Sequence, residues 1–277
     1  MPTLIVYTVY IVASVCIAIY YSFTKYSGIG KATWNGVQNY IRVFHDKFFW
    51  ISLKNTGIVL VISLVAITVL GFLLANVFRV KRRGNDICKA LIFSPAIISP
   101  IIVGIIWIYI LDPEIGLLNS ILYKMGKEGW MQAWIGGTVL SPYMYAIIFL
   151  WRQLGYMSTI FLAGLNMIPG EIYESAEIDG ANAWQQMIHV TIPMAKGTFN
   201  IVILLIITGV FKIFEFVTQL TAGGPNHLSE MLVTYSYTTT FSNGEYGYGM
   251  ALVTVTFIIT LVLSGIYNFI TRDKEEI

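Results

Sequence analysis

Six long apolar stretches alternate with shorter polar segments along the 277 residues of this chain. Each stretch is long enough to cross a bilayer as a helix, because about 20 apolar residues span the roughly 30 Å of hydrocarbon. Helices are expected because unpaired backbone groups are not tolerated in lipid, and the sequence lacks the alternation of a barrel. We predict an all-α integral membrane protein with six transmembrane helices, at about 3–24, 53–78, 88–111, 139–165, 198–220 and 246–271.

The first and third stretches carry details that refine this prediction. The first lacks a basic amino-terminal region and a small-residue cleavage site, so we interpret it as a retained helix and not as a signal peptide. The third contains Pro95, Pro100 and Gly104, so it should be kinked or closely packed by its neighbours. No internal repeat divides the chain, and residues 1–277 form one predicted transmembrane domain.

The polar segment 166–197, between the fourth and fifth stretches, has a regular pattern of its own. Gly180 supplies a residue that can break or turn a helix, and Pro193 marks the start of the next element. The pattern predicts helix, glycine, helix: a compact knob held at the membrane surface. The residues that follow one another at three- and four-residue spacing, as on one helix face, are Glu174, Glu177, Ile178 and Ala181.

The composition supports a membrane location and excludes several function classes. Hydrophobic residues make up 56% of the chain and charged residues 12%, with a mean hydropathy of +0.71. The 17 basic and 15 acidic residues give a net charge of +2, which offers no basis for nucleic-acid binding. Cys16 and Cys88 lie in different settings, so we expect no disulfide. No phosphate-binding GxxxxGK[ST] loop is present, so we expect no ATPase activity, no cofactor and no metal site in this chain.

The distribution of basic residues indicates the orientation. Five of them crowd into 79–89, whereas those of the facing polar segments are spread out. Because cytoplasmic loops carry an excess of Lys and Arg, we place 79–89 and both termini in the cytoplasm. The basic residues on that side are then Arg79, Lys81, Arg82, Arg83, Lys89, Lys196, Arg272 and Lys274.

Polar and charged residues inside the fourth and fifth stretches are a further signal. Arg152 and Gln153 lie near the middle of the fourth stretch. Lys212 and Glu215 are three residues apart in the fifth, which would place them on one helix face. A charge at bilayer depth costs roughly 2.5–3.5 kcal/mol and normally faces a partner or an aqueous cavity. Two interpretations stay open: a structural ion pair, or a polar path for a solute. Nearby aromatic residues, either packing groups or platforms for sugar rings, are Trp151, Tyr156, Phe211 and Phe214.

Four segments carry motifs that occur together in one transporter family. They are Asn35–Tyr40 with Lys54-Asn55-Thr56, Pro95–Trp107 with Pro113, Gly116 and Asn119, Glu174–Pro193, and Leu220–Pro225 with Tyr235 and Tyr237. They resemble the permease subunits of binding-protein-dependent ABC importers, in particular the carbohydrate-uptake group that includes the larger maltose-transporter permease. The segment Glu174–Pro193 is similar to the family's EAA-loop signature, with Glu174-Ser175-Ala176 in place of Glu-Ala-Ala and Ile192-Pro193 in place of Leu-Pro.

The resemblance implies a type I ABC importer permease in a bacterial plasma (inner) membrane. Its partners would be a second homologous permease, two ATPase subunits that bind ATP and Mg, and an extracytoplasmic solute-binding protein. The EAA loop (166–197) would form a coupling helix in a cleft of the ATPase, with an apolar face of Tyr173, Ala176, Ala181 and Trp184 buried there. Glu174 and Asp179 would meet donors or cap helices. The implied ATPase-coupling residues are Glu174, Ser175, Ala176, Asp179, Gly180 and Ala181.

The resemblance also implies a solute site built from the fourth and fifth stretches. Lys212 and Glu215 fall where the maltose subunit has two asparagines, which indicates either an acidic or amino sugar or a local ion pair. The implied substrate-path residues are Trp151, Arg152, Gln153, Tyr156, Lys212 and Glu215.

Two alternatives to sugar import remain at this point. One is an ABC permease for another small solute, such as an amino acid, a peptide or phosphate, against which the Thr221–Pro225 motif argues through the resemblance. The other is an ion-driven secondary transporter that uses Lys212, Glu215 and Arg152 as a relay. An ion-driven carrier has no need for an EAA loop, so the segment 166–197 favours the importer.

Overall fold

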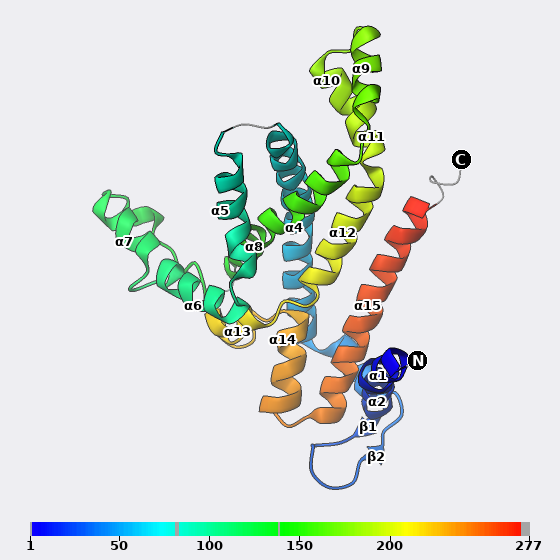
Figure 1. The fold of residues 1–277 in the computed structure, drawn as a ribbon. Helices are drawn as coiled ribbons and strands as arrows, with labels where there is room; N and C mark the ends of the chain where they lie inside the picture. The colour runs from blue at the N-terminus through cyan, green and yellow to red at the C-terminus, as the bar shows by residue number, and fades with distance from the viewer. Residues whose placement is uncertain (1, 81–82, 138, 273–277) are drawn as a thin grey trace.

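The computed structural model describes residues 2–80, 83–137 and 139–272, which form an elongated bundle of helices (Figure 1). Lys81, Arg82 and Lys274 of the basic clusters lie outside the described residues. Four helices are long and apolar enough to cross a membrane, namely Thr3–Ser22, Lys47–Arg79, Ser141–Asn166 and Tyr246–Thr271. Two bent helix pairs raise this number to six when each pair counts as one span. The predicted helical membrane fold is confirmed.

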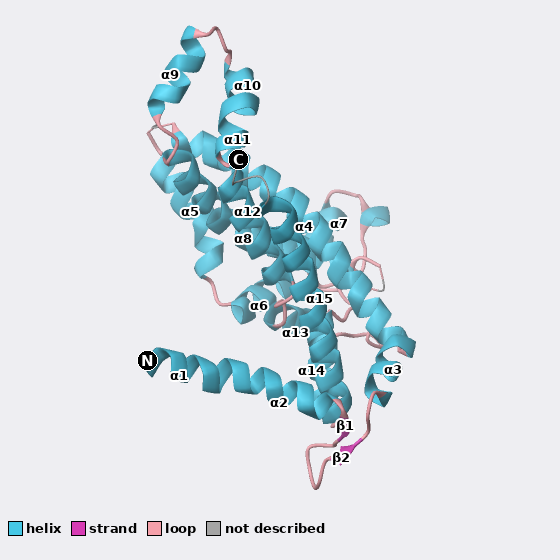
Figure 2. Ribbon diagram, turned by 90° about the vertical axis from the view of Figure 1, so that its right-hand side faces the viewer, coloured by secondary structure: helices cyan, strands magenta, loops and turns pink. Residues whose placement is uncertain are grey.

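The amino-terminal helix lies apart from the rest of the bundle. It comprises α1 (Pro2–Tyr7), the π-turn η1 (Thr8–Val12) and α2 (Ala13–Ser22), and it runs out sideways in Figure 2. None of the most apolar 18 residues of this segment is buried within the chain. Its carboxyl end packs on α15 (Tyr246–Arg272). The hairpin of β1 (Thr24–Lys25) and β2 (Thr33–Trp34) and the short α3 (Gln38–His45) then lead into the bundle.

The centre of the bundle is the pair formed by α4 (Lys47–Arg79) and α8 (Ser141–Asn166). Helix α4 begins where the Asp46 carboxylate accepts the Phe48 N–H at 2.8 Å, which satisfies one of the free amides of the first turn. Its buried residues include Val59, Ile67 and Ala75. The Phe161 ring of α8 lies next to Gly71, where a Cβ would be in ordinary van der Waals contact with the ring at 3.5 Å.

The third apolar stretch is broken at Pro100 into α5 (Asn85–Ile97) and α6 (Pro100–Leu111). The two helices meet at 101°, a larger bend than the kink that its prolines predict. Proline disfavours a helical conformation in the residue before it, and Ile98 and Ser99 are extended, with ψ of 134° and 135°. After the break, Gly104 allows α6 to pack closely on α13 (Glu215–Thr221), since a Cβ there would lie 2.6 Å from Gln219 Cβ.

The fifth stretch is also divided, which corrects the prediction of one continuous helix over 198–220. Helix α12 (Lys196–Val210) ends before a non-helical segment at 211–214, and α13 starts at Glu215. Lys212 therefore lies in the non-helical segment and Glu215 at the start of α13, so the two are not on one helix face. Beyond α13 the chain continues through α14 (Leu232–Tyr237) and the π-turn η4 (Thr238–Ser242) into α15.

The connection from α6 to α8 holds the remaining short elements, α7 (Leu117–Lys124) and η2 (Glu128–Trp130). Asn119 fixes this connection, because its amide donates to the carbonyls of Pro113 at 2.9 Å and Gln132 at 3.0 Å. Its carbonyl oxygen accepts the indole N–H of Trp134 at 2.7 Å. The motif residue Asn119 thus has a structural role in the connection that projects from the side of the bundle (Figure 1).

Candidate functional site

The EAA loop projects from one end of the bundle as a helical hairpin (Figure 1). It contains α9 (Gly170–Ile178), α10 (Ala183–Gln186), the π-turn η3 (Met187–Thr191) and α11 (Ile192–Met194). Gly180 ends the first arm with φ of 81°, a left-handed conformation that glycine adopts without strain. The order of helix, glycine and helix is therefore the one that the sequence predicts.

Asn182, and not Asp179, caps the second arm of the EAA loop. The Asn182 carboxamide accepts the Gln185 N–H at 2.9 Å, and the Gln185 side chain accepts the Asn182 N–H at 2.8 Å. This reciprocal pair is a capping box. Asp179 sits at the carboxyl end of α9, where a carboxylate does not complement the helix dipole, so its expected capping role is wrong. Glu174 and Asp179 are both exposed.

The tip of the EAA loop exposes apolar side chains beside a hollow. Ile178 is 87% exposed and Trp184 67% exposed, which is unusual for side chains of this size unless a partner covers them. The adjoining hollow has a volume of about 320 Å³. Its lining comes from both arms: Ala176, Asp179, Gly180, Ala181, Gln185, His189 and Val190. The predicted coupling residues Ser175 and Gly180 are exposed there as well.

Tyr173 does not belong to this outward face, which corrects the apolar face expected from the sequence. Its side chain is half-buried and packs against the main core of the bundle. Its hydroxyl lies 3.1 Å from Thr191 Oγ1, and the guanidinium of Arg79 lies 4.4 Å from its ring centroid. Tyr173 therefore faces the bundle, while Ile178, which the sequence places on the same face as Glu174, points to the surroundings.

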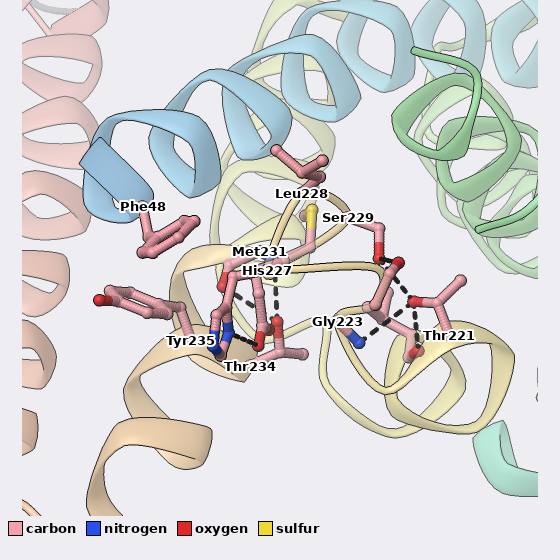
Figure 3. Close-up of polar contacts among 12 residues, drawn as sticks. Phe48, Thr221, Gly223, His227, Leu228, Ser229, Met231, Thr234 and Tyr235 are labelled. Carbon is pink, nitrogen blue, oxygen red and sulfur yellow. Dashed lines mark hydrogen bonds and ion pairs between the residues drawn. The ribbon is translucent and has the colours of Figure 1, made fainter. Parts of the chain in front are cut away.

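A second loop, 221–231, lies at the opposite end of the bundle between α13 and α14, and we call it the distal loop. Four of its residues have positive φ, namely Ala222, Gly223, Asn226 and His227. Only Gly223 adopts this conformation without steric cost, since the other three carry a Cβ. The Thr221 hydroxyl lies 2.7 Å from the Tyr145 hydroxyl of α8 and 2.9 Å from the Ser229 hydroxyl. The contact with Ser229 closes the loop on itself (Figure 3), and the contact with Tyr145 joins it to α8.

The start of α4 holds the distal loop through two polar residues of the Lys54-Asn55-Thr56 motif. The Asn55 amide donates to the carbonyls of Leu228 at 3.0 Å and Glu230 at 2.9 Å. The Thr56 hydroxyl accepts the Leu232 N–H at 3.1 Å. Both side chains are buried. The Lys54-Asn55-Thr56 motif and the distal loop, far apart in the sequence, are therefore parts of one structural unit. The sequence signals this unit through polar residues at the start of an apolar span.

A cluster of charged and aromatic groups surrounds this unit. The Glu230 side chain is fully buried, and His227 Nδ1 lies 3.2 Å from its carboxylate. The His227 ring sits 5.0 Å from the Phe48 ring (Figure 3). Asp46 accepts hydrogen bonds from the Tyr235 and Tyr248 hydroxyls. Burial alone would raise the pKa of Asp46, but these bonds and those from backbone amides outweigh it, so the pKa lies below its usual 3.8.

The predicted substrate-path residues of α8 differ in their surroundings. Arg152 and Gln153 are half-buried, and Trp151 and Tyr156 are more exposed. The Trp151 ring packs edge-on against Trp107 of α6, with centroids 5.8 Å apart. The Arg152 Nε is buried without a hydrogen-bond partner among the described residues.

Lys212 belongs to a cavity of about 510 Å³ between α12, α14 and α15. Lys212 and Glu215 are exposed, and within the described part of the chain no ion pair joins them. The cavity lining carries hydroxyl and aromatic groups and does not include Glu215 or the predicted residues of α8. Its residues are Thr208, Phe211, Lys212, Val233, Ser236, Tyr237, Thr240, Phe241, Met250, Val253, Thr256, Phe257 and Thr260.

A helical membrane bundle with a helix–glycine–helix loop at one end and a cavity between its spans defines a permease. The family of binding-protein-dependent transport system inner membrane components matches residues 67–275, so the chain belongs to that family. This membership confirms the resemblance found in the sequence. Among residues 2–80, 83–137 and 139–272, no three His, Cys, Asp or Glu side chains gather as a metal site.

Relatives and a solved structure agree with this assignment. The chain is 35% identical to the probable ABC transporter permease protein YurN of Bacillus subtilis, over 89% of this chain and 85% of YurN. It is 30% identical to the probable starch degradation products transport system permease protein AmyD of Thermoanaerobacterium thermosulfurigenes, over 99% of this chain and 92% of AmyD. The chain has the same fold as a crystal structure of a bacterial ABC transporter involved in the import of the acidic polysaccharide alginate, with a TM-score of 0.86 and 22% identity. The match covers 100% of this chain and 94% of the transporter chain.

Asn55→Ala should release the distal loop from α4. The change leaves two buried carbonyl groups without their donor, which costs about 1–3 kcal/mol in a typical protein interior. We expect a lower melting temperature of the purified permease in detergent. Asn76→Ala is the matched control in the same helix, because the Asn76 amide bonds only the Phe72 carbonyl of its own helix at 2.9 Å. Equal melting temperatures for the two variants would contradict this role of Asn55.

Proposed function

We propose that this chain is one of two homologous membrane subunits of an ATP-driven sugar importer and that it docks an ATPase subunit through the EAA loop. The observation that carries the proposal is the projecting helical hairpin with exposed Ile178 and Trp184. The relative AmyD is named for the transport of starch degradation products, which supports a sugar as the solute. ATP and Mg would bind to the ATPase, and a solute-binding protein would deliver the sugar from outside.

The chemistry of the hairpin suits a protein groove. Ile178 and Trp184 supply apolar area, and Glu174 and Asp179 are exposed carboxylates that can accept hydrogen bonds from the partner. No heavy atom outside the local chain lies within 4 Å of a Cβ placed on Gly180, so a partner can approach the backbone there. Closure of the ATPases on ATP would move the docked loops of both permeases and change the access of the path from inward to outward.

The orientation follows from this docking. The carboxyl ends of α4 and α15, the amino end of α5 and the EAA loop lie at the same end of the bundle (Figure 1). A cytoplasmic ATPase therefore places the basic segment 79–89 and the carboxyl terminus in the cytoplasm, in agreement with the positive-inside rule. The cytoplasmic position of the amino terminus stays a prediction from charge.

The solute path is proposed to include the cavity of Lys212 and the polar face of α8 with Arg152, Gln153 and Tyr156. Aromatic rings offer stacking faces to sugars, and a lysine offers a charged donor to hydroxyl or carboxylate oxygens. The absence of an ion pair with Glu215 among the described residues leaves the Lys212 ammonium available to a solute and removes the support for a structural ion pair. Membership of a binding-protein-dependent family contradicts the ion-driven alternative.

Gly180→Arg and Glu174→Lys should prevent docking. A long side chain at the tip of the hairpin blocks close approach of the partner, and a reversed charge at position 174 removes an acceptor. We expect each variant to insert in the membrane but to lose copurification with the ATPase subunit. The controls are Gly30→Arg, which has nearly the same left-handed φ (84° against 81°) in the distant hairpin, and Glu114→Lys, an exposed carboxylate at the far end. Normal copurification of the ATPase with both test variants would refute the proposed docking site.

Lys212→Gln should weaken solute recognition without affecting assembly. Loss of a charged donor lowers affinity by about tenfold, the low end for a hydrogen bond to a charged group. We expect the KM for uptake of the sugar that the cognate binding protein delivers to rise by about this factor in proteoliposomes. Lys196→Gln, at the first residue of α12 and at the end of that helix away from the cavity, is the control and should leave the KM unchanged. An unchanged KM in Lys212→Gln would exclude Lys212 from the solute path.

A further inference from the structure

Three side chains join the EAA loop to the inner end of α4, and we call them the inner clamp: Arg79, Tyr173 and Thr191. Arg79 is the last residue of α4, and its guanidinium lies 4.4 Å from the centroid of the Tyr173 ring in α9. The Tyr173 hydroxyl donates to Thr191 Oγ1 at 3.1 Å in the second arm, because the Thr191 hydroxyl itself donates to the Gln186 carbonyl. One tyrosine therefore contacts both arms of the loop and a separate transmembrane helix.

The covalent connections of the EAA loop to the bundle are both interrupted. Between α8 and α9 the helical path stops at Met167, and Pro169 is extended with ψ of 138°. Between the second arm and α12 the helices Ala183–Met194 and Lys196–Val210 meet at 67°. Neither connection is therefore one straight helix, although the backbone bonds of Ala195 to Thr191 and Phe199 continue across the second bend. The inner clamp is a side-chain contact that fixes the hairpin against α4 in spite of these breaks.

Helix α4 runs without interruption from the inner clamp to the distal loop. Its 33 residues correspond to about 50 Å of helix. It is held along its length by close packing on α8. At its outer end Asn55 and Thr56 bind the distal loop, and Asp46 binds the hydroxyls of Tyr235 and Tyr248. A displacement of one end of a packed helix moves the other end, because close-packed helices transmit strain.

We propose that the inner clamp transmits the movement of the ATPase-docked EAA loop to α4, and that α4 carries this movement to the distal loop at the other face of the membrane. Arg79 and Tyr173 act as positioning residues, since neither reaches solute or nucleotide. The proposal rests on the docking function of the EAA loop. It assigns the polar residues toward both ends of α4 a joint purpose: each end of one helix contacts a loop that must move in step with the other.

The stacking geometry determines which substitutions break the inner clamp. A guanidinium over a tyrosine face contributes about 0.5–2 kcal/mol, and a lysine retains part of this attraction whereas a glutamine does not. Tyr173→Phe keeps the ring and loses only the bond to Thr191. Tyr173→Leu removes the aromatic ring and the hydrogen bond to Thr191. Arg83→Gln is the matched control, because Arg83 is exposed four residues beyond Arg79.

The first test measures coupling in the complete importer, reconstituted with its ATPases, its second permease and its binding protein. We expect Arg79→Gln and Tyr173→Leu to copurify with the ATPase and hydrolyse ATP, while the sugar transported per ATP falls at least about fivefold, as for a lost coupling free energy of roughly 1 kcal/mol. Tyr173→Phe should fall between these and the unmodified protein, and Arg79→Lys should retain part of the coupling that Arg79→Gln loses. Unchanged transport per ATP in Arg79→Gln and Tyr173→Leu would overturn the proposal.

The second test reads the distal loop directly, which a merely structural role of the clamp would not affect. Asn226→Cys places one exposed thiol in this loop after the two exposed native cysteines are replaced by Cys16→Ser and Cys88→Ser. Its labelling by a membrane-impermeant maleimide is compared without nucleotide and with vanadate-trapped ATP. With the clamp unmodified, and in Arg83→Gln, we expect the labelling rate to depend on nucleotide. In Arg79→Gln we expect the labelling rate to be the same with and without nucleotide. A nucleotide-dependent rate in Arg79→Gln would overturn the proposal.

Failure of the docking function is distinguishable from failure of the inner clamp. If the unmodified permease does not copurify with the ATPase, docking through the EAA loop is refuted and the clamp proposal falls with it. If Tyr173→Leu alone fails to assemble, Arg79→Gln decides, because Arg79 is a half-buried surface residue whose replacement opens no cavity in the core. Assembly with unchanged coupling in Arg79→Gln refutes the clamp and leaves docking intact.

Discussion

The packing of α4 against α8 is the contact on which the rest of the permease depends. Lipid chains are as apolar as leucine, so two helices associate in a membrane through shape and close approach and not through hydrophobic burial alone. The Phe161 ring of α8 lies beside Gly71 of α4, and Gly155 lets α8 approach α5, where a Cβ would lie 2.2 Å from the Ile92 carbonyl oxygen. Helix α12 packs on both members of the pair. The α4–α8 pair therefore sets the positions of the spans on either side.

Each end of α4 carries a polar connection to a loop. At one end Arg79 meets the EAA loop, and at the other Asn55 and Thr56 meet the distal loop. Buried polar groups need partners, so the motif Lys54-Asn55-Thr56 fixes the backbone of a loop that otherwise has strained residues of positive φ. The permease thus combines an apolar interior suited to lipid with specific bonds at the two faces where its partners act.

The sequence predicts the helical fold well because hydropathy reports membrane burial directly. The carboxyl end of α4, both ends of α8 and the turn at Gly180 follow from the length of the apolar runs and from the conformation of glycine, whereas α4 begins at Lys47, six residues before the predicted span. The breaks are less visible: Pro100 predicts a kink, but not a 101° bend, and nothing in 211–214 marks the end of α12. A helix that ends inside an apolar run depends on tertiary packing, which the pattern does not contain.

The candidate site was predictable where the signal is local and not where it depends on distant contacts. The tip of the EAA loop is recognisable from Glu174–Pro193, whereas the inward direction of Tyr173 depends on Arg79, almost a hundred residues away in the chain. Similarly, the three-residue spacing of Lys212 and Glu215 indicates one helix face only while the helix is intact. The break at 211–214 separates them and leaves Lys212 in the cavity between α12, α14 and α15.

The distance between the EAA loop and the distal loop within one chain tests most directly whether α4 and the inner clamp join these two loops. Spin labels are attached at Glu171→Cys and Asn226→Cys in a variant that also carries Cys16→Ser and Cys88→Ser. Pulsed electron paramagnetic resonance then reports this distance in the complete importer. If α4 and the inner clamp join the two loops as one body, the distance is the same without nucleotide and with vanadate-trapped ATP. A change of about 5 Å or more, one helical turn, would show that the loops move independently and would contradict the account.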